Sequence, residues 1–154
     1  MKRAFFTLLV ATGCFALHAA PEPSPAPKPA ADSSGAEALA RSSALELAGA
    51  FSNDGYKIRD GFYFGELAPG KSVVVEVNLF AGNEYWFCAA ANAPARKLGV
   101  KVYDEKGALV EQQYYAEGAK AASGIVAAES GRYLVKVTLA EGEKSPVCFI
   151  YCYK

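Results

Sequence analysis

The sequence predicts a mainly β protein, an antiparallel sandwich or barrel of roughly seven or eight strands preceded by one short α-helix. From residue 56 onward, apolar residues alternate with polar ones, as in strands that bury one face. Turn-forming clusters such as APGK at 68–71 and ESGR at 129–132 separate these stretches. Residues 36–55 are the one segment with good helical periodicity.

Residues 1–19 are predicted to be a signal peptide. A basic pair follows the initial methionine, an apolar run extends to residue 17, and small residues close it at Ala19 and Ala20. The run is shorter than the roughly 20 residues of a membrane-spanning helix. We expect cleavage after Ala19, because a cut after Ala20 would leave Pro21 directly at the cleavage site. The mature chain then has no transmembrane span, and it is exported to the periplasm or the extracellular space.

A lipoprotein signal is the alternative interpretation of the same segment. Gly13-Cys14 resembles the end of the lipobox of bacterial lipoproteins, in which the cysteine is acylated. Ala11 stands where leucine is usual, and Phe15 is unusual after the cysteine, so soluble export is the preferred interpretation. Acylation at Cys14 would instead anchor the protein to the outer membrane.

Residues 20–35 are predicted to be an extended Pro/Ala-rich linker, because their five prolines exclude a helix or a central strand. The helix of residues 36–55 follows. Ser34 and Glu37 have the spacing of a capping box at its start, and Gly55 suits its end. A narrow apolar stripe predicts packing against the domain, and it consists of Ala40, Ala44, Leu47, Ala48 and Phe51.

The β-sandwich domain is predicted to cover residues 56–154. The candidate strands are residues 60–67, 72–80, 84–91, 97–103, 108–115, 123–128, 132–139 and 146–153, the sixth and seventh being separate if a turn divides them. Two of them, EYWFCAAA and PVCFIYCY, are apolar on both faces. Such strands either lie centrally with both faces covered or expose an aromatic patch.

Four segments together resemble bacterial pre-peptidase C-terminal domains. They are LAPGKSVVVEVNLFAGNEYWFCAAA at 67–91, LGVKVYDEKGALV at 98–110, ESGRYLVKV at 129–137 and VCFIYCY at 147–153. The resemblance covers residues 60–154 and lies mainly in the order of the segments. It implies a jelly-roll-like β-sandwich. In that family the module is an accessory or binding domain of exported proteins and is not the catalytic part.

The composition excludes several classes of function. Sixteen basic and sixteen acidic residues are scattered singly, which argues against a nucleic-acid partner. The one histidine, His18, lies in the predicted signal peptide, so the mature chain has no His-based nucleophile and no histidine for a metal site. No phosphate-binding glycine motif is present, and no pair of carboxylates stands out. We therefore predict no enzymatic activity, no cofactor and no metal.

Aromatic residues are the most suggestive candidates for binding. Trp86, Tyr114 and Tyr115 form the predicted binding surface, since exposed rings on a sandwich commonly bind sugars or peptides. The sequence therefore favours an exported binding or accessory module that recognises a glycan or a protein at the cell envelope. The alternative is a structural or assembly protein of the envelope, tethered through the linker and Cys14.

The cysteines are interpreted as structural. Cys148 and Cys152 lie about 13 Å apart along one extended strand, whereas a disulfide needs Cα atoms within roughly 7 Å. Export favours oxidation of cysteines to disulfides. Cys88 is the natural partner of Cys148 or Cys152, because it too lies on the strand face opposite the Tyr/Phe residues of its strand. We predict a Cys88–Cys148 disulfide, with Cys88–Cys152 as the alternative, and one cysteine left over.

Overall fold

The computed structural model describes residues 33–59, 61–92 and 95–154. The predicted signal peptide, with Ala19 and Ala20, and the alternative acylation site Cys14 lie outside the described residues. So does most of the predicted linker. No helix among the described residues is long and apolar enough to cross a membrane.

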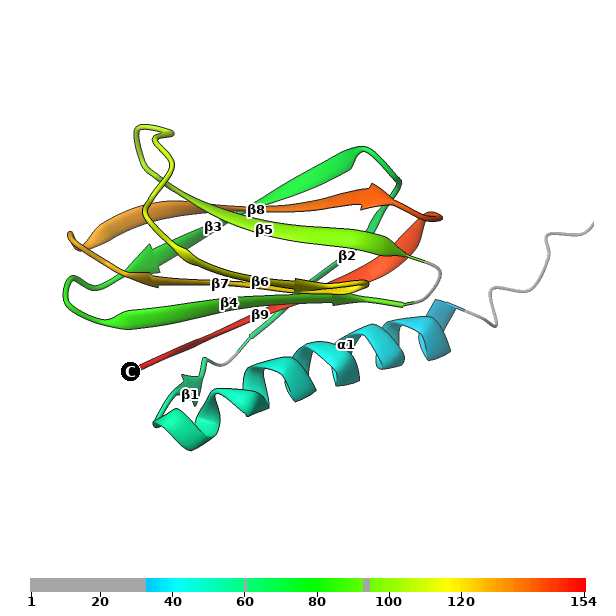
Figure 1. Cartoon of the computed structure of the whole chain (residues 1–154), viewed down its shortest axis with the longest axis horizontal. Coiled ribbons are helices and arrows are strands. Elements are labelled where there is room, and N and C mark those ends of the chain that lie inside the picture. Colours follow the sequence, from blue (N-terminus) through cyan, green and yellow to red (C-terminus); the bar gives the residue numbers. More distant parts are fainter. Residues whose placement is uncertain (1–32, 60, 93–94) are drawn as a thin grey trace, which may run out of the picture.

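The described chain forms two antiparallel sheets that face one another, with one helix beneath them (Figure 1). Helix α1 spans Ser33–Ala50, and a short 3-10 turn spans Ser52–Asp54. The strands are β1 Lys57–Ile58, β2 Tyr63–Leu67, β3 Lys71–Leu79, β4 Glu84–Ala91, β5 Arg96–Asp104, β6 Gln113–Glu117, β7 Lys120–Val126, β8 Gly131–Glu141 and β9 Ser145–Tyr153. We call the sheet ordered β1-β9-β4-β7-β6 sheet A, in which β2 also pairs with β9, and the sheet ordered β3-β8-β5 sheet B.

The predicted β-sandwich with a preceding helix is confirmed, and the two separate sheets decide against a barrel. The described residues contain nine strands, one more than the eight predicted segments, because the short strand β1 precedes them. The segment predicted at 60–67 forms β2, which begins only at Tyr63. The strand predicted at 108–115 begins only at Gln113. The chain turns at residues 105–107, where the Asp104 carboxylate accepts hydrogen bonds from the Lys106 and Ala108 amides, and Leu109 makes only an isolated bridge to Tyr103.

The main core fills the space between the sheets. Alternate residues of β4, such as Tyr85 and Phe87, point inward and meet the inward valines of sheet B. Phe87 has no exposed surface and stacks on Phe149 of β9 with ring centroids 6.2 Å apart. The alternation that predicted the strands therefore separates core from surface, as expected for a sandwich.

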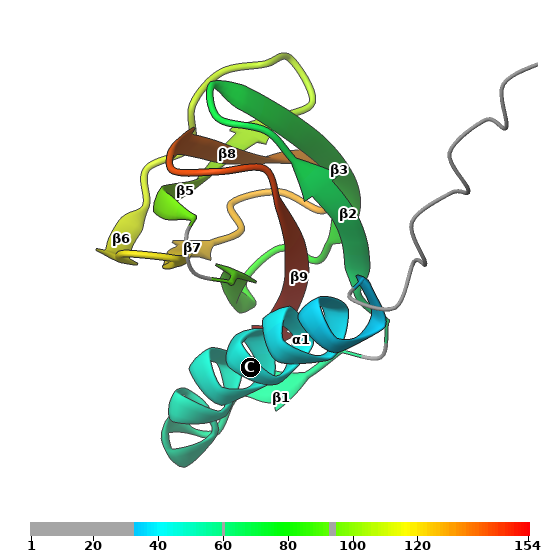
Figure 2. The ribbon, with the colours of Figure 1, turned by 90° about the vertical axis from the view of Figure 1, so that its right-hand side faces the viewer.

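A second core lies on the other face of sheet A, under α1. The helix packs on β9 and β4, and Figure 2 shows it lying along the outside of this sheet. Its buried residues are small, namely Ala40, Ala44 and Ala48, and they contact a sheet surface of Cys88, Ala90, Ala122, Cys148 and Ile150. Small side chains on both surfaces let helix and sheet approach closely. This cover explains why β4 and β9 are apolar on both faces.

The helix differs from its prediction at both ends. It begins at Ser33, inside the predicted linker, so Ser34 lies within the helix and not at the position before its first residue. It ends at Ala50, before the predicted end at Gly55. Gly55 instead ends the following 3-10 turn with a φ of 86°, a left-handed conformation that favours glycine.

Candidate functional site

Strand β6 forms one edge of sheet A and is its most exposed strand. All five of its residues, Gln113–Glu117, are exposed, and among the described strands it pairs only with β7. Figure 2 shows β6 at the rim of the molecule, on the side away from β2 and β3. The outer backbone groups of this strand are therefore open to a further strand.

The turn between β6 and β7 indicates which backbone groups of β6 point outward, away from β7. Glu117 pairs with Lys120 across the two-residue turn Gly118–Ala119, where Gly118 has a φ of 57°. In such a hairpin the residues next to the turn exchange both hydrogen bonds, and every second residue does the same. Tyr114 and Ala116 lie between those positions, so their N–H and C=O groups point away from β7.

A hollow of about 390 Å³ borders the inner side of β6. Tyr114 and Ala116 line it together with Leu98, Gly99 and Thr138 of sheet B. The Tyr114 hydroxyl reaches across to β5, because a Cβ atom at Gly99 would be in ordinary van der Waals contact with it at 3.4 Å. A side chain of a strand added beside β6 could enter this hollow.

A second hollow, of about 500 Å³, lies at the start of β6. Trp86 and Gly124 contribute to it from the sheet, Gln112 and Gln113 from the chain that leads into β6, and Tyr56 from beyond α1. The two hollows flank one edge strand. This arrangement suits an extended polypeptide, whose side chains alternate between two faces.

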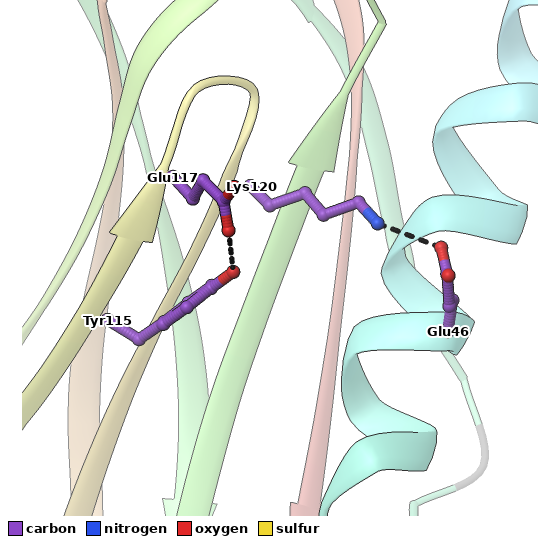
Figure 3. Close-up of polar contacts among 4 residues, drawn as sticks. All are labelled: Glu46, Tyr115, Glu117 and Lys120. Carbon is purple, nitrogen blue, oxygen red and sulfur yellow. Dashed lines mark hydrogen bonds and ion pairs between the residues drawn. The ribbon is translucent and has the colours of Figure 1, made fainter.

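Polar contacts occupy the far end of β6, next to its turn (Figure 3). The Tyr115 hydroxyl donates to Glu117 Oε2 at 2.8 Å, and this bond to the carboxylate raises the pKa of Tyr115. Across the turn, Lys120 Nζ donates to Glu46 Oε2 of α1 at 2.8 Å, which lowers the pKa of Glu46. The tip of the β6–β7 hairpin is thereby linked to the helix, while Tyr115 and Glu117 remain exposed.

Trp86 is placed differently from the two tyrosines of the predicted binding surface. It lies half-buried on the outer face of sheet A, stacked on Phe51 with centroids 4.3 Å apart and an interplanar angle of 13°. Its ring also covers Gly124, because a Cβ atom there would lie 2.7–3.0 Å from three indole atoms. The structure thus brings Tyr114 and Tyr115 to one strand and holds Trp86 against the end of the helix.

The sequence did not single out a polar cluster beside Trp86. Tyr56 donates to Glu84 Oε2 at 2.6 Å, and Lys154 Nζ lies 3.2 Å from the same oxygen and 4.5 Å from the Tyr56 ring centroid. These two bonds lower the pKa of Glu84. Burial and the bond to Glu84 raise the pKa of Tyr56. Residues distant in sequence meet here, so no local pattern could have indicated the cluster.

The three cysteines of the described chain are buried under α1 as free thiols, so the predicted Cys88–Cys148 disulfide is not formed in this structure. Antiparallel pairing of β4 and β9 places Cys88 opposite Ile150, Cys148 opposite Ala90, and Cys152 opposite Trp86. No cysteine therefore faces another directly. Cys88 is a diagonal neighbour of both cysteines of β9.

Among the described residues, no group of three or more His, Cys, Asp or Glu side chains could hold a metal ion. Of the described surfaces, the edge of β6 with its two hollows is the candidate binding site that the geometry favours.

No protein-family model matches the chain, and no curated protein matches it. Among solved structures, it is similar to PliG of Aeromonas hydrophila, a periplasmic lysozyme inhibitor of g-type lysozyme, with 15% sequence identity and a TM-score of 0.43. The match covers 61% of this chain and 85% of that chain. The two sheets of the structure agree with the resemblance to pre-peptidase C-terminal domains only at the level of a β-sandwich.

Proposed function

We propose that this protein is an exported, non-catalytic binding module that takes up an extended segment of a partner protein at the cell envelope. The observation that carries the proposal is the edge of β6, five exposed residues that pair with β7 alone among the described strands. A partner segment would add to sheet A as a further strand. Main-chain hydrogen bonds would supply affinity, and the two hollows would select side chains.

The exposed rings favour a polypeptide over a glycan. Sugars stack on the open face of an aromatic ring, but Phe51 and Gly124 cover the ring of Trp86. Tyr114 and Tyr115 are 57% and 37% exposed, yet adjacent residues of a strand point to opposite faces. They cannot form one flat platform. One ring on each face is instead suited to the alternating side chains of an added strand.

Strand β5, the edge of sheet B on the same side of the sandwich, is less available for pairing with a partner strand. The chain that follows β5 already forms a hydrogen bond with this strand, from the Val110 N–H group to the Val102 carbonyl. The Leu98 N–H group of β5 donates to the Gly118 carbonyl. By contrast, β6 contains no proline and no lysine, the residues that commonly protect an edge strand. Its single charge, Glu117, lies at its end.

Ala116 offers a direct test of strand addition. Ala116→Pro would remove an outward N–H group and leave the ladder to β7 intact, because proline is tolerated on the solvent side of an edge strand. Ala116→Ser is the matched control, since it keeps the N–H. Twelve-residue peptides selected from a random phage-displayed library on the full chain would be measured by fluorescence anisotropy against both variants.

We expect the proline variant to bind selected peptides about tenfold more weakly or worse, and the serine variant to match the unmodified chain. The lost hydrogen bond and the partner carbonyl that it leaves unpaired together cost about 1–2 kcal/mol, which gives a change of this size. Equal binding by both variants would contradict strand addition at β6. Loss of binding in Val74→Lys instead would place the site on the edge of β3, and binding only to a glycan array would favour a sugar ligand.

Export is tested separately. Cell fractionation with intact-mass measurement should find the chain outside the cytoplasm with a new N-terminus after Ala19. A mass that corresponds to a chain acylated at Cys14 would support the lipid-anchored alternative, and an uncleaved cytoplasmic chain would contradict export.

A further inference from the structure

A third hollow, of about 430 Å³, lies on the other side of the sandwich from β6. It opens between β9 of sheet A and β3, an edge strand of sheet B, close to where β2 begins. Figure 2 shows β2 and β3 on the side of the molecule away from β6. The volume of this hollow is in the range that holds a small molecule, and the proposed strand addition makes no use of it.

Apolar and aromatic side chains line the inner part of this hollow. Phe149 and Tyr151 point inward from β9, with ring centroids 6.3 Å apart, and Val75 and Val77 line it from β3. Phe149 and Val77 belong to the buried core, whereas Tyr151 and Val75 are only half-buried. The hollow therefore reaches the edge of the main core, and a planar apolar group could lie against the tyrosine ring.

Arg59 also lines the hollow, from the chain between β1 and β2. Its N–H group donates to the Tyr151 carbonyl at 3.0 Å, and its guanidinium carbon lies 5.9 Å from the centroid of the Tyr151 ring. The Arg59 side chain is exposed, and the ion pairs found among the described residues do not include it. A guanidinium group can bind a carboxylate through two parallel hydrogen bonds. The hollow thus combines an apolar interior with a cation that can meet an anion.

Strand β3 adds backbone donors to the same hollow. The Val102 carbonyl of β5 bonds outside sheet B, so Val102 and its ladder partner Val135 of β8 form a pair without mutual hydrogen bonds. The backbone groups of Val135 then point to β3, where they bond to Val75. Backbone direction alternates along a strand, so the N–H groups of Glu76 and Asn78 do not both follow Val75 but point away from β8. Both residues line the hollow.

The side chain of Glu76 points away from the interior of the hollow. Side chains alternate along a strand, and Val75 and Val77 on either side of it pack toward the core. The Glu76 carboxylate therefore lies on the outer face of sheet B, where it pairs with Arg132 Nη1 at 3.5 Å. The charges around the hollow consequently favour an anionic ligand.

We propose that this hollow binds a small aromatic carboxylate, with its ring against Tyr151 and its carboxylate on Arg59. The N–H groups of Glu76 and Asn78 are further donors to the carboxylate oxygens. The aromatic ring of the ligand packs on the exposed part of the tyrosine and the valines of β3. Its single negative charge is matched by the guanidinium group, which gains the strongest hydrogen bonds with a carboxylate.

The probe is indole-3-acetate, titrated into the 15N-labelled full chain and followed by the amide chemical shifts in NMR spectra. We expect saturable shifts of the Glu76, Asn78 and Tyr151 amides, with a dissociation constant of about 1 mM or lower, as typical ligand efficiencies give for a molecule of this size. The Tyr114 and Ala116 amides should not shift, which separates this site from the edge of β6. Indole-3-acetamide has the same ring without the charge, and it should bind about tenfold more weakly or worse.

Two variants complete the test. Arg59→Gln should weaken binding of indole-3-acetate about tenfold or more, because it removes the charged donors. Arg96→Gln is the matched control, since it makes the same change of charge at an exposed residue of β5, at the other edge of sheet B, and it should bind like the unmodified chain. Dispersed amide spectra show that both variants are folded.

Equal binding of the acid and the amide, or equal weakening in the two variants, would overturn the proposal. The absence of shifts at Glu76 and Asn78 up to about 10 mM ligand, well above the expected constant, would do the same. Shifts of these amides on dilution without ligand would show that a second copy of the chain occupies the hollow, which also contradicts the proposal. None of these outcomes depends on whether β6 binds a peptide.

Discussion

Gly124 is expected to be required for the packing of Trp86 against Phe51, which holds the chain after α1 on sheet A. The Cβ atom of Gly124→Ala would lie 2.7 Å from Trp86 Cε2 and 2.8 Å from Cζ2, about 1 Å inside normal carbon–carbon contact. The indole cannot simply move away, because Phe51 is stacked 4.3 Å from it. Relief of the clash must therefore displace Phe51 and the chain that follows the helix.

Overpacking of this kind costs about 1–3 kcal/mol, and loss of the stacked pair adds about 0.5–1.5 kcal/mol. Replacing a strand glycine returns about 0.5–1 kcal/mol through the unfolded chain. We expect a net loss of about 1–3 kcal/mol, measured as the free energy of unfolding in urea with Trp86 fluorescence as the signal. The folded protein should also show a red-shifted emission maximum, because the ring becomes more exposed.

Gly49→Ala is the matched control, because no atom lies within 4 Å of its added Cβ and it lies in the last turn of α1. Both changes restrict the unfolded chain equally, so the difference between them isolates the clash. Gly49→Ala should stabilise by up to about 1 kcal/mol. If Gly124→Ala were as stable as the control, with unchanged emission, the proposed packing of Trp86 between Gly124 and Phe51 would be wrong.

Three further outcomes test other parts of the structure. Ala44→Leu should destabilise by about 1–3 kcal/mol in urea unfolding, because Ala44 is fully buried between α1 and sheet A, while Leu45→Ala at a more exposed position should change little. Phe87→Ala should cost about 3–5 kcal/mol, since its side chain fills the main core. Glu84 has a pKa below its usual 4.5 when folded, so its stabilising effect is present above that pH and is lost as the pH falls through the lower, folded value. Tyr56→Phe removes the first cause of that shift, and urea midpoints between about pH 5 and pH 3 should then fall less steeply.

Much of the architecture could be predicted because it depends on local periodicity. Alternation in β3, β5 and β8 marked one buried face in each strand, and the structure places those faces toward the core. The apolar stripe of the helix was also visible in the sequence. Ends of elements were less predictable, because helix starts and turn positions depend on contacts such as those of the Asp104 carboxylate.

The candidate site was predicted only in part. Tyr114 and Tyr115 were recognised as exposed aromatics, but nothing local shows that their strand is the last one in its sheet. In the sequence, Trp86 cannot be distinguished from an aromatic residue that is exposed for binding. Its position under Phe51 depends on where the helix crosses the sheet, 35 residues away in sequence from Trp86.

The sequence by itself determined the mainly β class, the helix that precedes the strands and the lack of a histidine outside residues 1–19, because these follow from residue type and short-range spacing. Only the tertiary structure decided which strands are edges, which aromatic rings stay open and which cysteines are neighbours. Strand order and register are set by contacts between residues far apart in the chain, and one residue of register decides which face a side chain occupies. For that reason Cys88 lies opposite Ile150, between Cys148 and Cys152 of the neighbouring strand.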